Sequence, residues 1–487
     1  MQNSERVAKI LVISAIASLF FRRGIFHPYF LQPFEFLIIL AFVITIISLF
    51  FSKRIVAETK KDVISWLKFW GLFFLFLTIG LIYSYFFYHD AITKDVIGGL
   101  IKDYFALLTN ALAFLMIIYY SRNPGFIKQS LNAFLSSFSY SLFVIFPSLI
   151  LIFNVTEAGS TFIGFHNSRT ALASLLIISF AIITAFFVKE KNMIKKIIFW
   201  VGVVFIVSLI LWAGSRAGYL ALATMAGFIV IYLFLNTEEK LKLIFKSAVI
   251  ILSTVIIAYL ILPLPAKNMI IIQIFPQFSY LLDTSESEVV KIGLKPIKIA
   301  LPWWYPENPN AIKIDRITTI TTISNFTFFK KVFKNPNLQI PEDGRQTIWS
   351  KALKLFIKNP LGLSTQFYNI DRTIMAGGFP AGAHNTFLQV GLSGGWLGFI
   401  LFGFLIYKVF YSLKNSFDKS VQWLALTVMN FGFLIALLVD DRLFNPWLWV
   451  IISLAIGYHQ SKSINKTSLY NSAALSQECF SASNRLA

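Results

Sequence analysis

The residues whose types suit chemistry are concentrated between positions 341 and 398, a stretch that starts polar and ends apolar. Its glycine-rich part contains His384 followed by Asn385, and its polar part contains Arg345 and Trp349, four residues apart. A histidine titrates near neutrality, so it can take a proton from an attacking hydroxyl group. An arginine offers a planar fork of donors that binds a phosphate through two hydrogen bonds. These residue types predict base-assisted attack on a phosphate-bearing substrate, with His384 as the base. Arg345, Trp349 and Asn385 are the candidate substrate-binding residues of this stretch.

Each of these residues also has a plainer interpretation. A lone histidine at a membrane interface more often makes a hydrogen bond than it catalyses. Arg345 could be a solvated residue near a helix start, although the helix dipole makes that position mildly unfavourable for a cation. That unfavourable placement favours the functional interpretation of Arg345.

A second arginine lies in the sequence Gly214-Ser215-Arg216-Ala217-Gly218, which separates two apolar runs. An arginine at the edge of a membrane is costly unless it pairs with a partner or reaches water. Arg216 is therefore a candidate for gripping a phosphate, and a diphosphate on a lipid would lie at this depth. The alternative is a tight turn with a snorkelling arginine, which the segment favours when it is taken alone.

A second His-Asn pair occurs in the segment 165–169, where His166 and Arg169 are candidate substrate-binding residues and His166 is a rival base. The alternative is a helix start with Asn167 or Ser168 as its cap, and we rank it ahead of catalysis. The sequence leaves the choice between His384 and His166 open.

The charged turn Asp440-Asp441-Arg442 could bind a metal, but we interpret it as self-paired and structural. The sequence contains no P-loop, zinc signature or Asp-x-Asp motif in a polar domain, so we predict no metal site and no cofactor. The glycines after the histidine either allow close helix packing or mark a helix break. They are Gly391, Gly394, Gly395 and Gly398.

The composition is that of a polytopic membrane protein. Of 487 residues, 57% are hydrophobic and only 14% are charged, and the mean hydropathy is +0.70. The net charge of +20 does not indicate nucleic acid, because the basic residues lie between apolar runs and set the membrane orientation. The single cysteine, Cys479, excludes an intrachain disulfide.

The fold class we predict is an all-α polytopic membrane protein with about 12 transmembrane helices and one long, partly helical outer loop. Lys and Arg in the short connections place both termini inside. The predicted spans are 7–21, 32–52, 66–88, 104–120, 134–154, 170–188, 197–213, 217–235, 246–264, 386–407, 421–440 and 443–458. The predicted domains are helices 1–9 in 1–264, the outer loop in 265–385, helices 10–12 in 386–460 and a disordered inner tail in 461–487.

Within the loop, residues 345–358 have the pattern of an amphipathic helix. Asp343 is its predicted N-cap, and Asn359-Pro360 should end it. Its apolar stripe consists of Ile348, Trp349, Ala352, Leu355 and Phe356.

Together these motifs resemble the bacterial O-antigen ligase and O-antigen polymerase superfamily. The resemblance rests on the segment 214–218, on Gly-Arg-x-x-x-Trp and Asn-Pro-Leu-Gly within 344–362, and on His384-Asn385 with the glycines that follow. It implies a metal-independent glycosyltransferase of the inner membrane with its active site on the periplasmic face. The donor would be a glycan on undecaprenyl diphosphate, and the acceptor lipid A–core in ligases or another carrier-linked glycan in polymerases. By this resemblance Arg216 and Arg345 bind the diphosphate and His384 is the general base.

Three alternatives remain open at this point. Residues 265–340 carry no motif that matches the superfamily, which leaves ligase and polymerase nearly level, with a preference for the ligase. A transporter of lipid-linked glycans would show intramembrane charges and repeated halves. A structural subunit would scatter the two arginines and the histidine, whereas an enzyme should bring them together.

Overall fold

The structure is a computed structural model. It describes residues 2–19, 33–52, 57–123, 125–151, 169–262, 267, 345–371, 375–376, 379–380 and 382–463. His166, Asp343, nearly all of 265–340 and the tail from residue 464 lie outside these ranges.

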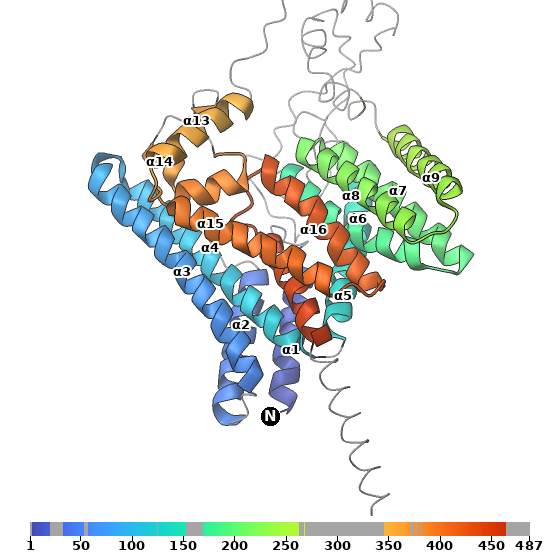
Figure 1. Cartoon of the computed structure of the whole chain (residues 1–487), viewed down its shortest axis with the longest axis horizontal. Coiled ribbons are helices and arrows are strands. Elements are labelled where there is room, and N and C mark those ends of the chain that lie inside the picture. Colours follow the sequence, from blue (N-terminus) through green and yellow to red (C-terminus); the bar gives the residue numbers. More distant parts are fainter. Residues whose placement is uncertain are drawn as a thin grey trace, which may run out of the picture.

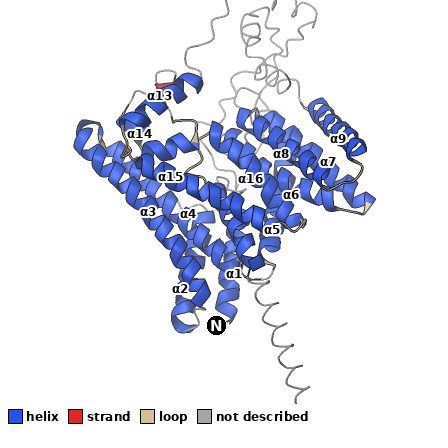
Figure 2. Ribbon diagram, in the orientation of Figure 1, coloured by secondary structure: helices blue, strands red, loops and turns tan. Residues whose placement is uncertain are grey.

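Helices dominate the described chain (Figures 1 and 2). The first half contains α1 (Gln2–Ser18), α2 (Pro33–Ser52), α3 (Ala57–Phe87), the 3-10 turn η2 (His89–Ala91), α4 (Lys94–Tyr120) and α5 (Phe126–Leu151). The middle contains α6 (Arg169–Lys189), α7 (Met193–Ala213), α8 (Arg216–Leu235) and α9 (Lys240–Ile261). The last part contains α13 (Arg345–Lys358), α14 (Phe367–Ile370), α15 (Thr386–Asn415), α16 (Val421–Val439) and a final helix over 446–463.

Every one of the twelve predicted spans overlaps one of these helices. Among the described residues, seven helices are long and apolar enough to cross a membrane, and the apolar parts of α2 and α9 are shorter. The count of twelve spans therefore stays a prediction, while the polytopic helical class is supported. The described part of 265–385 also contains a pair of two-residue antiparallel strands, β1 (Met375–Ala376) and β2 (Phe379–Pro380).

Two helix groups lie on either side of α15 and α16. On one side α15 packs against α3, which lies beside α4, and on the other side α16 packs against α6 and α8. Figure 1 shows α13 and α14 at one end of this arrangement, next to the start of α15. We refer to this end as the α13 end.

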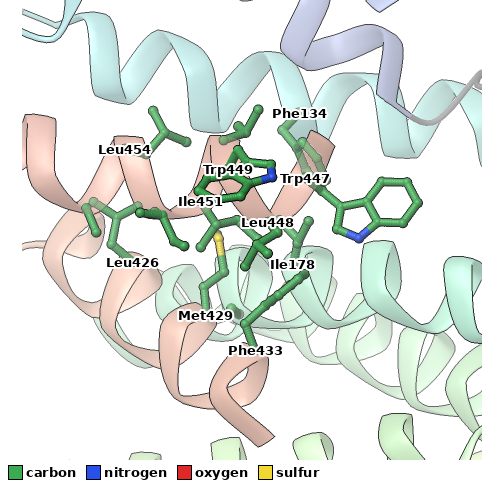
Figure 3. Packing of buried hydrophobic residues seen from close by; sticks show 14 of the residues in the cluster. Phe134, Ile178, Leu426, Met429, Phe433, Trp447, Leu448, Trp449, Ile451 and Leu454 are labelled. Atoms are coloured by element: carbon green, nitrogen blue, oxygen red, sulfur yellow. The ribbon is translucent and has the colours of Figure 1, made fainter. Parts of the chain in front are cut away.

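The final helix lies in the centre of the apolar core (Figure 3). Trp447 and Trp449 are almost completely buried, and the ring of Trp449 lies 4.6 Å from that of Trp70 in α3. Met429 and Phe433 of α16 are buried in the same cluster. A helix that is apolar all round is expected to be enclosed by others, as this one is. It continues to residue 463, three residues into the predicted tail 461–487.

The predicted span over 386–407 lies within α15, and of the two interpretations of its glycines the helix break is present. The backbone of α15 breaks at Gly395, whose φ of 68° and ψ of −165° are non-helical. Only glycine adopts this conformation readily. The segment before the break is a short half-helix of mostly buried residues, and the segment after it is the long apolar part of α15.

The break is possible because the segment after α13 replaces the missing helical hydrogen bonds. Leu363 N–H donates to Leu392 O (2.6 Å) and Ser364 N–H donates to Ser393 O (3.1 Å). On the other side of the break, Trp396 N–H donates to Pro360 O (2.9 Å). Backbone groups at membrane depth need such partners, since no water is there to supply them.

Three glycines allow this crossing of backbones. A Cβ on Gly362 would lie 2.5 Å from Gly395 N, and a Cβ on Gly395 would overlap Pro360 O. From α3, a Cβ on Gly80 would lie 2.5 Å from Ser393 O. The Asn-Pro-Leu-Gly and Gly-Gly motifs therefore form one structural unit, which we name the glycine crossing (Gly80, Gly362 and Gly395).

We expect Gly395→Ala to lower the free energy of unfolding by at least about 2 kcal/mol, because the backbone conformation is strained for alanine and the added methyl meets Pro360 O. Thermal unfolding of the purified protein in detergent measures the loss. Gly403→Ala in the same helix is the matched control, because a Cβ there meets nothing within 4 Å and alanine is the better helix former. An equal loss of unfolding free energy in the two variants would contradict the role assigned to Gly395 in the glycine crossing.

Candidate active site

His384 is held by its backbone. It adopts a left-handed conformation with φ 48°. This conformation is uncommon for a residue with a side chain, costs free energy and persists only where the surroundings impose it. Its N–H donates to Asp441 Oδ2 (3.1 Å), and its carbonyl accepts a hydrogen bond from Trp349 Nε1 (3.2 Å). These two contacts are made by the backbone N–H and carbonyl of His384, so they fix the position of the residue through its main chain.

Asn385 continues the same arrangement. Its N–H donates to the other carboxylate oxygen, Asp441 Oδ1 (3.1 Å). Its side-chain oxygen caps α15 by accepting from Leu388 N–H (3.1 Å), and its Nδ2 donates to Leu438 O of α16 (2.9 Å). The predicted substrate-binding residue Asn385 therefore has a structural task, which is to start the half-helix beside the end of α16.

The residues on either side of Asp441 are paired with one another. Arg442 Nη2 donates to Asp440 Oδ2 (2.6 Å), and both residues are buried. Thr386 Oγ1 donates to Asp440 O (2.6 Å) and accepts from Arg442 N–H (2.9 Å). The interpretation of this turn as self-paired is confirmed for Asp440 and Arg442, whereas Asp441 holds the histidine segment instead.

Burial acts against the charged forms of Asp441 and Arg442 at this turn. Burial raises the pKa of the Asp441 carboxyl, and His384 together with the N–H groups of His384 and Asn385 counteracts part of that rise. Burial likewise lowers the pKa of Arg442, against the effect of the neighbouring carboxylates. Gly382 leaves room for the carboxylate, because a Cβ there would overlap Asp441 Oδ2. The Asp441 carboxylate is thus enclosed between Gly382 and the backbone N–H groups of His384 and Asn385.

Helix α13 confirms the predicted amphipathic pattern and ends at Lys358, as predicted. Its buried stripe of Ile348, Ala352 and Leu355 packs in one cluster with Ala383, the residue before His384. This packing brings Trp349 to the His384 carbonyl. Arg345 is the first residue of α13, one turn before Trp349, or about 6 Å along the helix axis. The structure does not describe the side chain of Arg345.

The predicted tight turn at 214–218 is confirmed. Gly214 ends α7 in the left-handed conformation (φ 62°), and Ser215 Oγ caps α8 by accepting from Gly218 N–H (3.3 Å). Gly218 lies against α6, since a Cβ there would be 3.2 Å from Ala173 Cβ. Arg216 is the first residue of α8, and its side chain is outside the described part of the chain. Arg169 similarly opens α6, with its side chain undescribed.

The packing of α16 between α6 and α8 relates these helix starts to Asp441. Gly432 marks a common level: a Cβ there would lie 2.6 Å from Met225 Sδ of α8 and 3.1 Å from Ile177 Cγ2 of α6. Ring contacts confirm that α8 and α16 run antiparallel, with Phe228 4.6 Å from Phe431 and Tyr232 5.9 Å from Trp423.

From that common level, Arg216, Arg169 and Asp441 are each eight or nine residues away towards the same end. At a rise of 1.5 Å per residue, each of the three lies about 12–14 Å from the level of Gly432 along its helix axis. Packed helices are about 8–10 Å apart, so the starts of α6 and α8 lie about one helix spacing from Asp441. The backbone positions of both arginines therefore lie at the end that carries His384.

Residues 201–403 match the O-antigen ligase family. The matched residues include all three motifs, and the match confirms the resemblance to the O-antigen ligase and O-antigen polymerase superfamily. The class that the fold and the match support is a ligase- or polymerase-type membrane glycosyltransferase, which acts on a lipid-linked glycan and an acceptor. No curated protein matches the chain.

Asp441 lies outside the matched residues, and the sequence prediction did not include it in the site. One signal could have indicated it. An acidic residue that directly follows an apolar span, on the same predicted side as a candidate histidine, is costly to bury without a partner.

We expect Asp441→Asn to lower the free energy of unfolding by about 1–3 kcal/mol, because one of the two N–H groups then faces an amide NH₂ instead of an acceptor. Thermal unfolding provides the measurement. Asp90→Asn is the matched control at the α13 end, since its side chain is fully exposed and the change should stay within about 0.5 kcal/mol. A loss at Asp441 no larger than at Asp90 would contradict the role of the carboxylate.

Proposed function

We propose that the chain is an O-antigen ligase-like glycosyltransferase that moves a glycan from undecaprenyl diphosphate to a hydroxyl of lipid A–core. The observation that carries the proposal is the hydrogen bonding of His384 to Asp441 at the end where α8 and α13 start. In this proposal the site lies on the periplasmic face of the inner membrane, within the long loop and the helix ends that surround it.

The base in this proposal is His384. Its imidazole takes the proton of the acceptor hydroxyl while the hydroxyl oxygen bonds to the anomeric carbon. The bond between that carbon and the diphosphate oxygen breaks, and its electron pair leaves with the carrier. Attack from the side opposite the leaving group inverts the anomeric configuration. The fixed backbone of His384 supports this role, because a base must be positioned before its pKa matters.

Arg216 and Arg345 stabilise the charge that develops on the departing diphosphate. Each is the first residue of its helix, where free N–H groups and the helix dipole also favour an anion. Trp349, Arg169 and His166 are proposed to line the substrate site. The reaction as written requires no metal.

The direct test is transfer of a lipid-linked oligosaccharide to lipid A–core by the purified protein, without added metal or nucleotide. We expect His384→Ala to lower the transfer rate at least about 100-fold, in line with the loss of a general base. His459→Ala is the matched control, because His459 pairs with Ser416 Oγ (2.9 Å) at the opposite end of α15 and the final helix, and it should retain the rate of the unaltered protein.

Longer carrier-linked chains in place of glycosylated lipid A–core would identify a polymerase of the same superfamily. Neither product from folded protein that binds the donor would reject the enzyme and favour a transporter of lipid-linked glycans.

We expect Arg216→Gln and Arg345→Gln each to lower kcat/KM about 100- to 1,000-fold, since each removes a donor to the departing diphosphate. Arg→Lys at either position should recover only part of the loss, because lysine keeps the charge but not the planar fork. Lys354→Gln, on the exposed side of α13, is the control and should change kcat/KM less than about twofold. Arginine variants that match this control would reject the diphosphate clamp.

A further inference from the structure

A second feature lies far from His384, between α6, α7, α8 and α9. These helices enclose a cavity of about 110 Å³ whose walls are almost entirely apolar. Val255 of α9 lines the cavity and remains 42% exposed, so this side of the cavity lies at the outer surface of the helix bundle. Figure 1 shows α9 at the edge of the molecule, beside α7 and α8. An apolar cavity of this kind stays dry and accepts apolar ligands.

The cavity extends away from the α13 end. Along α8 its lining runs from Leu222 to Leu233, about 16 Å, and finishes two residues before that helix ends. On α6 it finishes at Val188, next to the last residue of the helix, and on α9 it starts at Ser247. One end of the cavity is therefore at the ends of α6 and α8 that lie opposite the candidate active site.

That end carries a concentration of lysines. The ammonium of Lys196 lies 5.5 Å from the ring centroid of Phe187, which lines the cavity. Lys189 hydrogen bonds to Tyr232 Oη, one residue from the lining residue Leu233, and Lys246 precedes the lining residue Ser247. The segments 189–196 and 238–246 together contain seven lysines and three glutamates. Of those glutamates, Glu190 accepts from the N–H groups of Lys191 and Asn192, and Glu239 is paired with Lys242.

The cavity wall also contains a buried polar group that lacks a hydrogen-bond partner among the described residues. Thr184 is 94% buried, and its hydroxyl has no hydrogen-bond partner among the described residues. The other polar pair in the wall is satisfied internally, since Trp200 Nε1 donates to Thr254 Oγ1 (3.1 Å). A buried hydroxyl without a partner costs free energy unless a ligand supplies one. The ester carbonyl of a lipid is an acceptor at a suitable depth.

We infer that this cavity binds one acyl chain of an anionic glycerophospholipid from the membrane leaflet at the lysine-rich end. The apolar walls take the chain, Thr184 donates to an ester carbonyl, and the lysines face the phosphate headgroup. A polyprenyl chain fits less well, because its diphosphate would lie at the opposite end, beside Arg216 in the proposed function. The site is thus a lipid-binding site separate from the candidate active site.

The test uses native mass spectrometry of the full chain with phosphatidylglycerol, phosphatidylcholine and undecaprenyl phosphate as separate probes. We expect selective retention of phosphatidylglycerol. Lys196→Gln and Lys246→Gln should each weaken its apparent affinity about fivefold, as expected for one lysine near a headgroup. Lys408→Gln is the matched control, because that ammonium also lies over aromatic rings (5.3 Å from Phe404) but on α15, away from the cavity. It should leave the affinity unchanged.

A second variant tests the cavity itself. Ala226→Phe places a ring in the space that the acyl chain would fill, and we expect it to abolish retention of phosphatidylglycerol while thermal unfolding in lipid-free detergent is unchanged. Undiminished retention in this variant would overturn the inference. So would equal retention of phosphatidylcholine, stronger retention of undecaprenyl phosphate, or equal effects of the Lys196 and Lys408 substitutions. The glycosyl-transfer assay is independent of all these outcomes.

Discussion

The candidate site depends on one carboxylate that accepts hydrogen bonds from two successive backbone N–H groups. Asp441 binds the N–H groups of His384 and Asn385 through its two oxygens, at 3.1 Å each. Burying a carboxylate is expensive, and only partners with good geometry repay the cost. The carboxylate therefore requires the left-handed turn at His384, and that turn in turn sets the start of α15. The final pair of helices and the loop segment are fixed to each other at this point.

The glycine crossing supplies the second constraint. A half-helix that ends at membrane depth leaves carbonyl and N–H groups that must find partners. The segment 360–364 provides these partners for Leu392, Ser393 and Trp396. The same segment follows directly from α13, the helix whose Trp349 donates to His384. The motifs at 344–362 and 384–395 are consequently one unit in space. Residues 384–395 contain the histidine and the half-helix that follows it. The segment after α13 stabilises the break at the end of that half-helix.

Much of this could be predicted from the sequence, because the relevant signals were local. The stripe Ile348, Ala352 and Leu355 follows the helical period, and Asn359-Pro360 ends the helix by known rules. The turn at Gly214 and Ser215 likewise follows from capping chemistry. What escaped prediction depends on contacts between distant segments. Gly80 matters only because Ser393 O lies against it, and Asp441 matters only because His384 is folded onto it. The glycines around Gly395 were consistent with either close helix packing or a helix break. The break forms because the backbone of residues 360–364 supplies hydrogen bonds on both sides of it.

The central claim is that the starts of α8 and α13 and the turn at His384 form one site. Cross-linking tests it most directly, in a Cys479→Ser background that removes the single native cysteine. The substitutions Arg216→Cys and His384→Cys would be combined and treated with a bifunctional thiol reagent that spans about 10 Å, one helix spacing. The account predicts efficient cross-linking of this pair and none between Arg216→Cys and His459→Cys, which lies at the other end of the final helix. Cross-linking of the first pair no greater than of the second would contradict it.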